Sequence, residues 1–336
     1  MEPLAPASLR QLIADPAIWD QMDLVEQRLT EVSNSNNAFL TKIAQHLLQA
    51  GGKRFRPLLA LLASNLGPSQ DHRPVEAGVA VELIHLGSLY HDDVIDEADA
   101  RRGVVSANTN WDNTVSILAG DFLLAKASEV AAQHLGDQAV VLLARTYAQL
   151  CEGQVLELQI THDVDHGRDD YFQVIGDKTA SLIRTSARLG AMASGATPED
   201  IEIVSNWAWD LGIAFQLIDD VLDLVAPSEF IGKPAGSDIK EGTFTLAVLE
   251  ALAADEGATI RDLLNQEPYS DEAVTRVIEI VRDGGYTDMA TTEARNRIAS
   301  ANAMLDQLPA RPAVHTMRSL GTYLLDQIDR ALTASS

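Results

Sequence analysis

Alanine, leucine and charged residues recur with a period near 3.6 over most of the 336-residue sequence, while alternating β-branched runs bounded by hairpin turns are scarce. This pattern predicts an all-α protein. The breaks, such as Gly51-Gly52, Thr197-Pro198 and the stretch 227–242, are too short for domain linkers. We therefore expect one domain over residues 1–336, with 1–22 as a peripheral N-terminal segment. Helices are expected over residues 23–49, 56–65, 75–99, 116–135, 137–160, 171–194, 198–224 and 245–254, and over several segments from 271 to the end.

The sequence is strongly acidic, with 49 acidic and 25 basic residues and a formal charge of −24. Such a protein has no broad electrostatic reason to bind nucleic acid or an anionic membrane. No run approaches the roughly 18 to 20 apolar residues that cross a bilayer, and residues 1–16 do not resemble a signal peptide, so we expect a cytoplasmic protein. The single cysteine, Cys151, excludes a disulfide framework and is expected to serve ordinary packing.

An aspartate cluster ends the apolar segment that begins near Val75. On a helix Asp92 and Asp96 lie one turn apart on one face, with Asp93 beside them. Like charges about 4 Å apart repel by roughly 4 kcal/mol at an effective dielectric constant near 20, so a cation is expected there. Few polar positions interrupt the preceding segment, which predicts a helix that others enclose.

A second copy of the pattern, Asp219, Asp220 and Asp223, ends another apolar helix 127 residues later. One such cluster is as readily a solvated helix end, but two copies after apolar helices favour a metal site. Carboxylates without histidine or thiolate favour a hard cation, and Mg²⁺ is bound by a few carboxylates plus substrate phosphates. The acidic loop and central glycine of a calcium-binding EF-hand are missing.

Basic residues accompany both clusters. A glycine turn carries Lys53 and Arg56 to the start of a helix, where backbone amides add to a diphosphate site that needs no metal. The pair Arg101-Arg102 follows the first cluster and either balances its charge or grips phosphates. Considered singly, three other residues have ordinary explanations: surface charges for the two lysines and a satisfied core residue for the histidine. They are Lys178, Lys233 and His85.

Over nearly its whole length the sequence resembles the trans-isoprenyl (polyprenyl) diphosphate synthases. Six elements match in order: 51–57, 85–103, Gly120-Asp121, Lys178-Thr179, 215–223 and 232–242. The resemblance implies an isoprenoid synthase bundle of about ten or more helices around a deep central cavity, usually in a homodimer. It also implies an enzyme that condenses isopentenyl diphosphate with an allylic diphosphate, head to tail and in the trans configuration.

The resemblance also assigns roles by position. Mg²⁺, with three ions per active site, would be bound by Asp92, Asp96, Asp219 and Asp223. Catalysis would depend on Asp92, Asp93, Asp96, Arg101, Lys178, Asp219 and Asp220. Isopentenyl diphosphate would contact Lys53, Arg56, His85 and Arg102, and the allylic diphosphate would contact Arg101, Lys178, Thr179, Gln216 and Lys233.

In this scheme the metal ions, Arg101 and Lys178 stabilise the leaving diphosphate, which also takes the final proton, so no side-chain base is needed. Product length should depend on residues beneath the first aspartates. Gly87 and Ser88 are small, whereas short-chain relatives tend to have aromatic residues there. Tyr90 lies about 200° from Asp92 around the helix and should point elsewhere. We therefore expect a product of about C30–C50, suited to a quinone (menaquinone) side chain.

Alternatives remain open. A geranylgeranyl or farnesyl diphosphate synthase would make a shorter product. A class I terpene cyclase would lack the second aspartate cluster and the Lys53 and Arg56 site, and a noncatalytic subunit of a two-protein synthase should have lost aspartates. Many members of the family also have a lysine and a proline where this chain has Thr243 and Ala247, and Lys240 is a possible replacement for the lysine.

Overall fold

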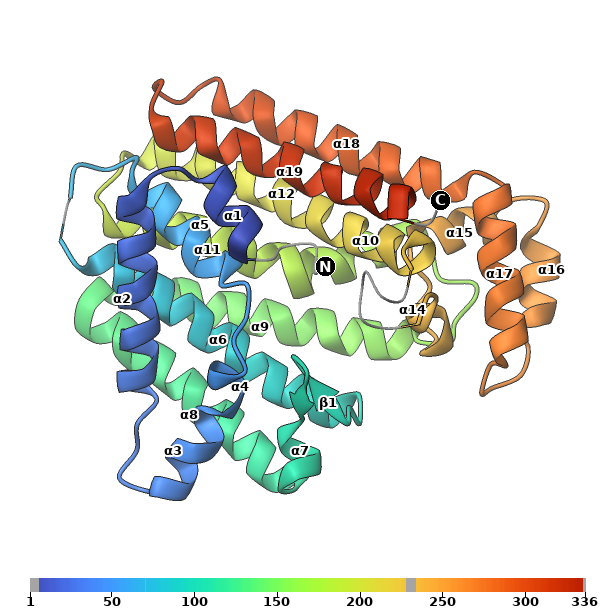
Figure 1. Cartoon of the computed structure of the whole chain (residues 1–336), viewed down its shortest axis with the longest axis horizontal. Coiled ribbons are helices and arrows are strands. Elements are labelled where there is room, and N and C mark those ends of the chain that lie inside the picture. The colour runs from blue at the N-terminus through green and yellow to red at the C-terminus, as the bar shows by residue number, and fades with distance from the viewer. Residues whose placement is uncertain (1–5, 70, 228–233, 335–336) are drawn as a thin grey trace. The chain divides into compact units, whose positions relative to one another are not determined.

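The computed structural model describes residues 6–69, 71–227 and 234–334, and nearly all of its regular structure is helical (Figure 1). The predicted all-α class is confirmed. The chain divides into two compact units. We call residues 13–148 with 182–205 the N-terminal unit, and residues 1–12 with 149–181 and 206–336 the C-terminal unit. The assignment of the whole chain to a single domain stays a prediction.

The N-terminal unit is built around one long helix, α6, which packs against α2, α5 and α8. Its side chains Ala77, Val79, Val81 and Leu83 are fully buried, so the expectation of an enclosed helix is confirmed. The helices of this unit are α2 (Pro16–Val32), α3 (Ala38–Ala44), α4 (His46–Gln49), α5 (Phe55–Ser64), α6 (Arg73–Ile95), α7 (Ala107–Asn110), α8 (Asn113–Val130), the π-helix η1 (Ala131–Leu135) and α11 (Ser181–Ala193). The unit also contains the first part of α9 (Asp137–Ile160) and of α12 (Pro198–Val225).

The C-terminal unit contains the rest of α9 and most of α12. Its core includes Trp207, which is 1% exposed, and Figure 1 shows α18 and α19 running side by side, in agreement with their contacts. The helices of this unit are α1 (Pro6–Leu12), α10 (Arg168–Ile175), the π-helix η2 (Gly176–Ala180), α12 (Pro198–Val225), α14 (Ser237–Lys240), α15 (Leu246–Leu252), α16 (Gly257–Leu263), α17 (Asp271–Asp283), α18 (Tyr286–Leu305) and α19 (Pro312–Ala334).

Two predicted helices have different boundaries. The helix expected over 23–49 is divided into α2, α3 and α4, because the Asn37 side chain accepts hydrogen bonds from the amides of Phe39 and Leu40 and so caps a new helix. The helix expected to reach Asp99 ends at Ile95, and Glu97 follows with a positive φ of 50°.

A small hairpin follows α6 and was not predicted. Its strands β1 (Ala100–Arg101) and β2 (Val104–Val105) pair antiparallel. The turn residues Arg102 and Gly103 both have positive φ, 54° and 74°, which matches the right-handed twist of a tight hairpin. Strands this short carry no alternating pattern for a sequence analysis to detect.

Other details differ from expectation. The segments expected as single helices over 116–135 and 171–194 each contain a π-helical turn, η1 and η2. The break over 227–242 contains α14. Cys151 is exposed, which does not fit the expectation that it serves ordinary packing.

Candidate active site

The aspartates of the first cluster stand at the C-terminal end of α6 in three environments. Asp92 is half-buried, Asp93 is fully buried and Asp96 is exposed. Arg101 Nε donates to Asp93 Oδ1 at 2.6 Å, and Arg101 Nη2 lies 3.9 Å from Asp96 Oδ2. Asp93 therefore anchors the hairpin that carries Arg101, and its carboxylate lies against the charge of that guanidinium ion.

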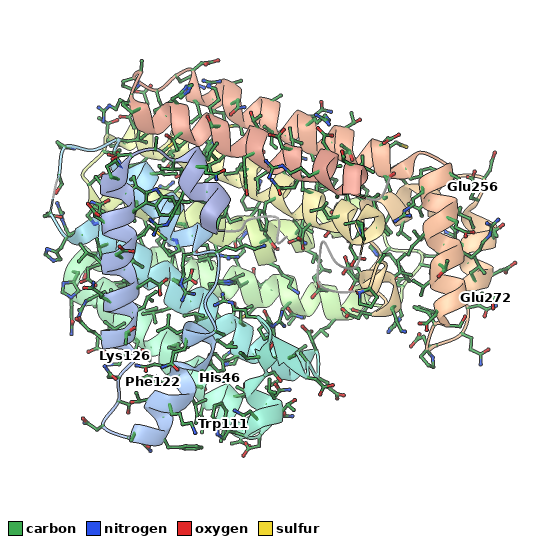
Figure 2. The ribbon with its side chains drawn as sticks, viewed as in Figure 1. His46, Trp111, Phe122, Lys126, Glu256 and Glu272 are labelled. Carbon is green, nitrogen blue, oxygen red and sulfur yellow. The ribbon has the colours of Figure 1, made fainter. Side chains whose placement is uncertain are left out.

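The hairpin has further attachments within the N-terminal unit. His46 Nε2, on α4, donates to the carbonyl oxygen of Val105 at 2.7 Å, and the Trp111 ring packs edge-on against the His46 ring at 5.1 Å (Figure 2). Arg102 Nη1 donates to the carbonyl oxygens of Leu47 (3.2 Å) and Gly51. These contacts place Arg102 beside the turn that carries Lys53 and Arg56.

Arg56 has the properties expected of an anion-binding residue. Its Nε atom is buried without a hydrogen-bond partner. Burial, aided by the neighbouring charge of Arg102 and opposed by Glu82 and Asp92, lowers the pKa of Arg56 to about 10. A bound anion would supply both the missing acceptor and the missing charge.

His85 lies on α6 three residues after the buried Glu82. Burial holds the pKa of His85 well below its usual range, and the nearby charges of Arg56, Arg102, Arg54 and Arg101 act in the same direction. The ring is therefore neutral at physiological pH and can donate one hydrogen bond without adding charge.

The residues expected to control product length have different surroundings. A Cβ atom on Gly87 would lie 3.0 Å from Leu124 Cγ and 3.1 Å from the carbonyl oxygen of Gly120, so Gly87 is at the close contact between α6 and α8. This does not fit the expectation that Gly87 borders a growing chain. Ser88 is half-buried and its hydroxyl donates to the His85 carbonyl oxygen. Tyr90 points elsewhere, as predicted, with its hydroxyl against Ile43.

In the second cluster, near the end of α12, Asp219 is exposed and Asp220 is buried. Tyr171 Oη donates to Asp220 Oδ2 at 2.5 Å and Gln216 Nε2 donates to Asp220 Oδ1 at 2.8 Å. Burial raises the pKa of Asp220 well above its usual range, the charge of Asp238 adds to this, and the two hydrogen bonds oppose it. Asp223 is also buried, and its Oδ2 accepts from the Asp238 amide at 3.4 Å.

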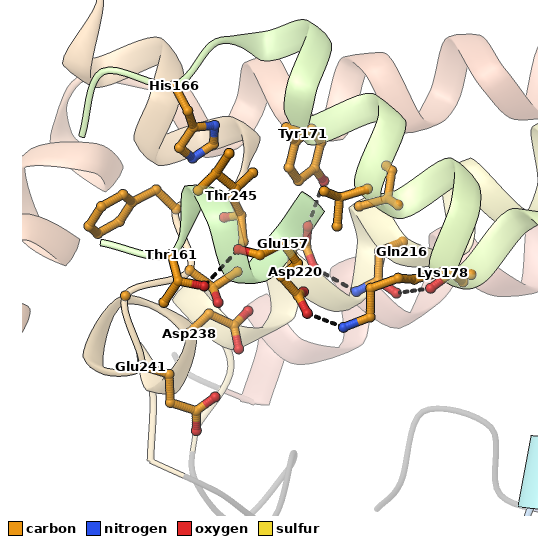
Figure 3. Close-up of a pocket in the computed structure, with 17 residues that line it drawn as sticks. Glu157, Thr161, His166, Tyr171, Lys178, Gln216, Asp220, Asp238, Glu241 and Thr245 are labelled. Carbon is orange, nitrogen blue, oxygen red and sulfur yellow. Dashed lines mark hydrogen bonds and ion pairs between the residues drawn. The ribbon is translucent and has the colours of Figure 1, made fainter. Parts of the chain in front are cut away.

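A cavity of about 200 Å³ in the C-terminal unit brings several of the predicted residues together (Figure 3). Lys178 and Thr179 come from the π-helix η2, whose wide turn presents both to the cavity. Lys178 pairs with Glu157, and Thr179 Oγ1 donates to Gln216 Oε1 at 2.9 Å. Lys233 lies outside the described residues.

The cavity is acidic. Glu157, Asp220, Asp238 and Glu241 line it, and Lys178 is the only lysine or arginine among its described lining residues. Lys240 does not line it; this side chain is exposed and pairs with Asp271, so its proposed replacement of the family lysine is not supported. A diphosphate would be repelled from such a cavity unless a cation entered with it.

The donor atoms of both clusters suit a hard divalent cation. Within residues 6–69, 71–227 and 234–334, no group of three or more histidine, cysteine, aspartate or glutamate side chains could hold a metal ion by itself. Mg²⁺, however, takes one or two carboxylates and completes its shell with water and substrate phosphates. The carboxylates present therefore fit Mg²⁺ that binds together with a diphosphate.

Sequence reasoning did not identify Tyr171 and Glu157, which hold Asp220 and Lys178. The available signal was weak: Tyr171 is a polar aromatic residue at a position that must be buried, and such a hydroxyl needs a partner.

None of the helices that the structure describes is long and apolar enough to pass through a bilayer.

Comparisons with known proteins bear on the family and the fold of this chain. A family model described as polyprenyl synthetase matches residues 37–281. The nonaprenyl diphosphate synthase of Mycobacterium tuberculosis is 40% identical over 90% of this chain and 91% of that protein. A decaprenyl diphosphate synthase structure from Rhodobacter capsulatus has a TM-score of 0.88 and 31% identity, covering 96% of this chain and 99% of that chain. The geranylgeranyl pyrophosphate synthase of Corynebacterium glutamicum, complexed with calcium and isoprenyl diphosphate, has a TM-score of 0.83 and 41% identity, covering 93% of this chain and 96% of that chain.

Proposed function

Because this chain belongs to the polyprenyl synthetase family, we propose that it condenses isopentenyl diphosphate with an allylic diphosphate, head to tail and trans, to give a long-chain polyprenyl diphosphate. The observation that carries the proposal is the acidic cavity beside the second aspartate cluster, with Lys178 and Thr179 at its wall. An anionic substrate can enter it only with a cation, which is the requirement of a metal-dependent diphosphate enzyme.

Asp92, Asp96, Asp219 and Asp223 would hold magnesium, with three ions per active site. Bound Mg²⁺ would neutralise charge that develops on the leaving diphosphate. Asp93 and Asp220 have their own partners, so their part in catalysis is to fix Arg101 and the end of α12. That Asp93 and Asp220 take part in catalysis stays a prediction, and a positioning role is the form of it that we propose.

The basic residues divide between the two substrates. Lys53, Arg56, neutral His85 and Arg102 bind isopentenyl diphosphate, and Arg56 is already desolvated for that contact. Arg101, Lys178, Thr179, Gln216 and Lys233 bind the allylic diphosphate. An apolar cavity around the reacting carbons would exclude water that otherwise captures the allylic cation. The released diphosphate takes the proton, which agrees with a His85 that is neutral and surrounded by arginines.

We propose a C30–C50 product for a quinone side chain, because Ser88 is small and the Mycobacterium tuberculosis relative makes a nonaprenyl chain. A geranylgeranyl product is the second candidate, favoured by the 41% identity to the Corynebacterium glutamicum enzyme. The homodimer and the cytoplasmic location stay predictions.

The test is an assay of purified protein with Mg²⁺, labelled isopentenyl diphosphate and allylic primers of several lengths, with chromatography of the dephosphorylated products. Asp92→Asn and Asp219→Asn should each lower turnover at least 100-fold, and chelation of the metal should abolish it. Asp255→Asn, at an exposed position, is the control and should retain activity. Full prenyl transfer by either cluster variant would refute the proposal.

A further inference from the structure

A buried glutamate on α6 has no role in the reaction described above. Glu82 is 1% exposed. Its Oε1 atom accepts a hydrogen bond from Arg54 Nη1 at 3.1 Å and lies 4.0 Å from Arg102 Nη2. A carboxylate this deeply buried is retained only where it is paired, so the two arginines and Glu82 form one charged group.

Arg54 is committed entirely to the protein. Its Nε and Nη2 atoms donate to the Glu26 carboxylate, and Nη2 also donates to the Leu48 carbonyl oxygen at 3.0 Å. Its Nη1 atom donates to the carbonyl oxygen of Gly51 at 3.4 Å and to Glu82 Oε1. All five N–H donors thus have acceptors, and none remains for a substrate. Arg54 fixes the turn from which Lys53 and Arg56 project.

The carbonyl oxygen of Gly51 also accepts from Arg102, so Arg54 and Arg102 converge on one carbonyl and one carboxylate. Gly52 makes room for them: a Cβ atom there would lie 2.9 Å from Arg102 Cζ. Arg54 and Arg102 both have positive φ, 47° and 54°, which surrounding contacts must enforce. Glu82 is a contact that the two strained arginines share.

The charges support the same conclusion. Burial lowers the pKa of Arg56 to about 10 and also lowers the pKa of Arg102, and in both cases Glu82 is the main charge that opposes the effect. Glu82 likewise raises the pKa of Arg54 against the effect of burial. One carboxylate therefore stabilises three guanidinium ions while leaving the group positively charged overall.

We propose that Glu82 is a positioning residue for the binding of isopentenyl diphosphate. It holds Arg102 directly and holds the turn 51–56 through Arg54, so that this substrate meets a preformed set of cations. This inference rests on the proposed function. Preorganised cations bind a diphosphate without the cost of gathering like charges at the moment of binding.

The test measures binding of isopentenyl diphosphate to the full chain by calorimetry, in chelator and without an allylic substrate. Glu82→Gln keeps an acceptor for Arg54 but removes the charge, and should raise Kd at least tenfold. In steady-state assays KM for isopentenyl diphosphate should rise in parallel, while KM for the allylic diphosphate stays within twofold. A general loss of structure would instead raise both KM values and lower the melting temperature.

Glu76→Gln is the matched control. Glu76 is also a buried glutamate of α6, 5% exposed, but pairs with Arg28, so its loss should leave Kd unchanged. Wild-type affinity in Glu82→Gln would overturn the role of Glu82, whereas failure of the wild-type protein to bind isopentenyl diphosphate would overturn the proposed function. If Glu82→Gln does not fold, Glu26→Gln decides. Glu26→Gln weakens the ion pair that Arg54 makes with the more exposed of its two glutamate partners, and it should raise Kd for isopentenyl diphosphate severalfold. Unchanged affinity would count against the proposal.

Discussion

The aspartates of each cluster have unlike environments. In each cluster the middle residue is buried and bonded to the chain itself, Asp93 to Arg101 and Asp220 to Tyr171 and Gln216, while Asp96 and Asp219 are exposed. The exposed carboxylates can be reached by metal and substrate from solvent, and the buried middle carboxylates hold neighbouring residues in place. Two chemically identical residues side by side thus have different tasks because their burial differs.

His85 gives a prediction on pH dependence. Burial and four arginines keep its pKa well below 6.5, so the folded state stays neutral while the unfolded state gains a proton as pH falls through 6.5. The contribution of neutral His85 to the free energy of unfolding is fully present well above pH 6.5 and is lost as pH falls below 6.5, by about 1.4 kcal/mol between pH 7.5 and 5.5. Urea unfolding at these two pH values should show that His85→Gln loses about that much less stability than wild type. Equal losses of stability in wild type and in His85→Gln would contradict a neutral His85 in the folded state.

Sequence reasoning found the charged residues that we propose to contact the substrates, because they occur in short motifs. It did not find Glu82, Glu157 or Tyr171, whose partners are distant in sequence: Tyr171 bonds to a residue 49 positions away. Nothing in a local pattern separates a buried glutamate from a solvated one. The same limit explains Gly87, which is adjacent to Ser88 in sequence but is placed against α8 by helix packing.

At the scale of elements, the hairpin and the π-turn each carry residues that we propose to bind substrate. The hairpin turn carries Arg102, and η2 carries Lys178 and Thr179. Long apolar helices were predicted well, since periodicity and length both favour them. Short elements were missed, because two-residue strands and a single wide turn are decided by tertiary contacts rather than by periodicity.

Product length can be tested on α6. Ser88→Phe should place a bulky ring one turn before Asp92 and shorten the product, as seen by chromatography, with little change in stability. Gly87→Ala should instead disturb the contact with α8 and lower the free energy of unfolding by about 1–3 kcal/mol, without shortening the product. An unchanged product in Ser88→Phe would rule out this face of α6 as the determinant of length.

At the scale of the whole molecule, a formal charge of −24 means that every diphosphate contact works against the overall field. The arginines around Glu82 and a bound divalent cation would each supply positive charge against this field. We expect activity to respond to ionic strength more weakly than surface binding would, because the guanidinium ion of Arg102, a proposed contact of isopentenyl diphosphate, is mostly buried.

The homodimer can be tested on α8, where Ile117 and Leu118 are 43% and 57% exposed. Large apolar side chains next to each other on a helix surface favour a partner. Leu118→Asp should shift the mass measured by light scattering from dimer toward monomer, whereas Leu24→Asp, at a similarly exposed leucine of α2, should not. A wild-type protein that is monomeric at micromolar concentration would show that no such interface exists.

The wide turn of η2 limits how this region can vary among relatives. A chain that lost one residue between Tyr171 and Ser181 would regain regular α-helical hydrogen bonds there. Lys178 and Thr179 would then be rotated by about 100° around the helix axis relative to the residues on one side of the deletion. Insertions and deletions should therefore collect in the loops outside this segment, and its length should be inherited unchanged.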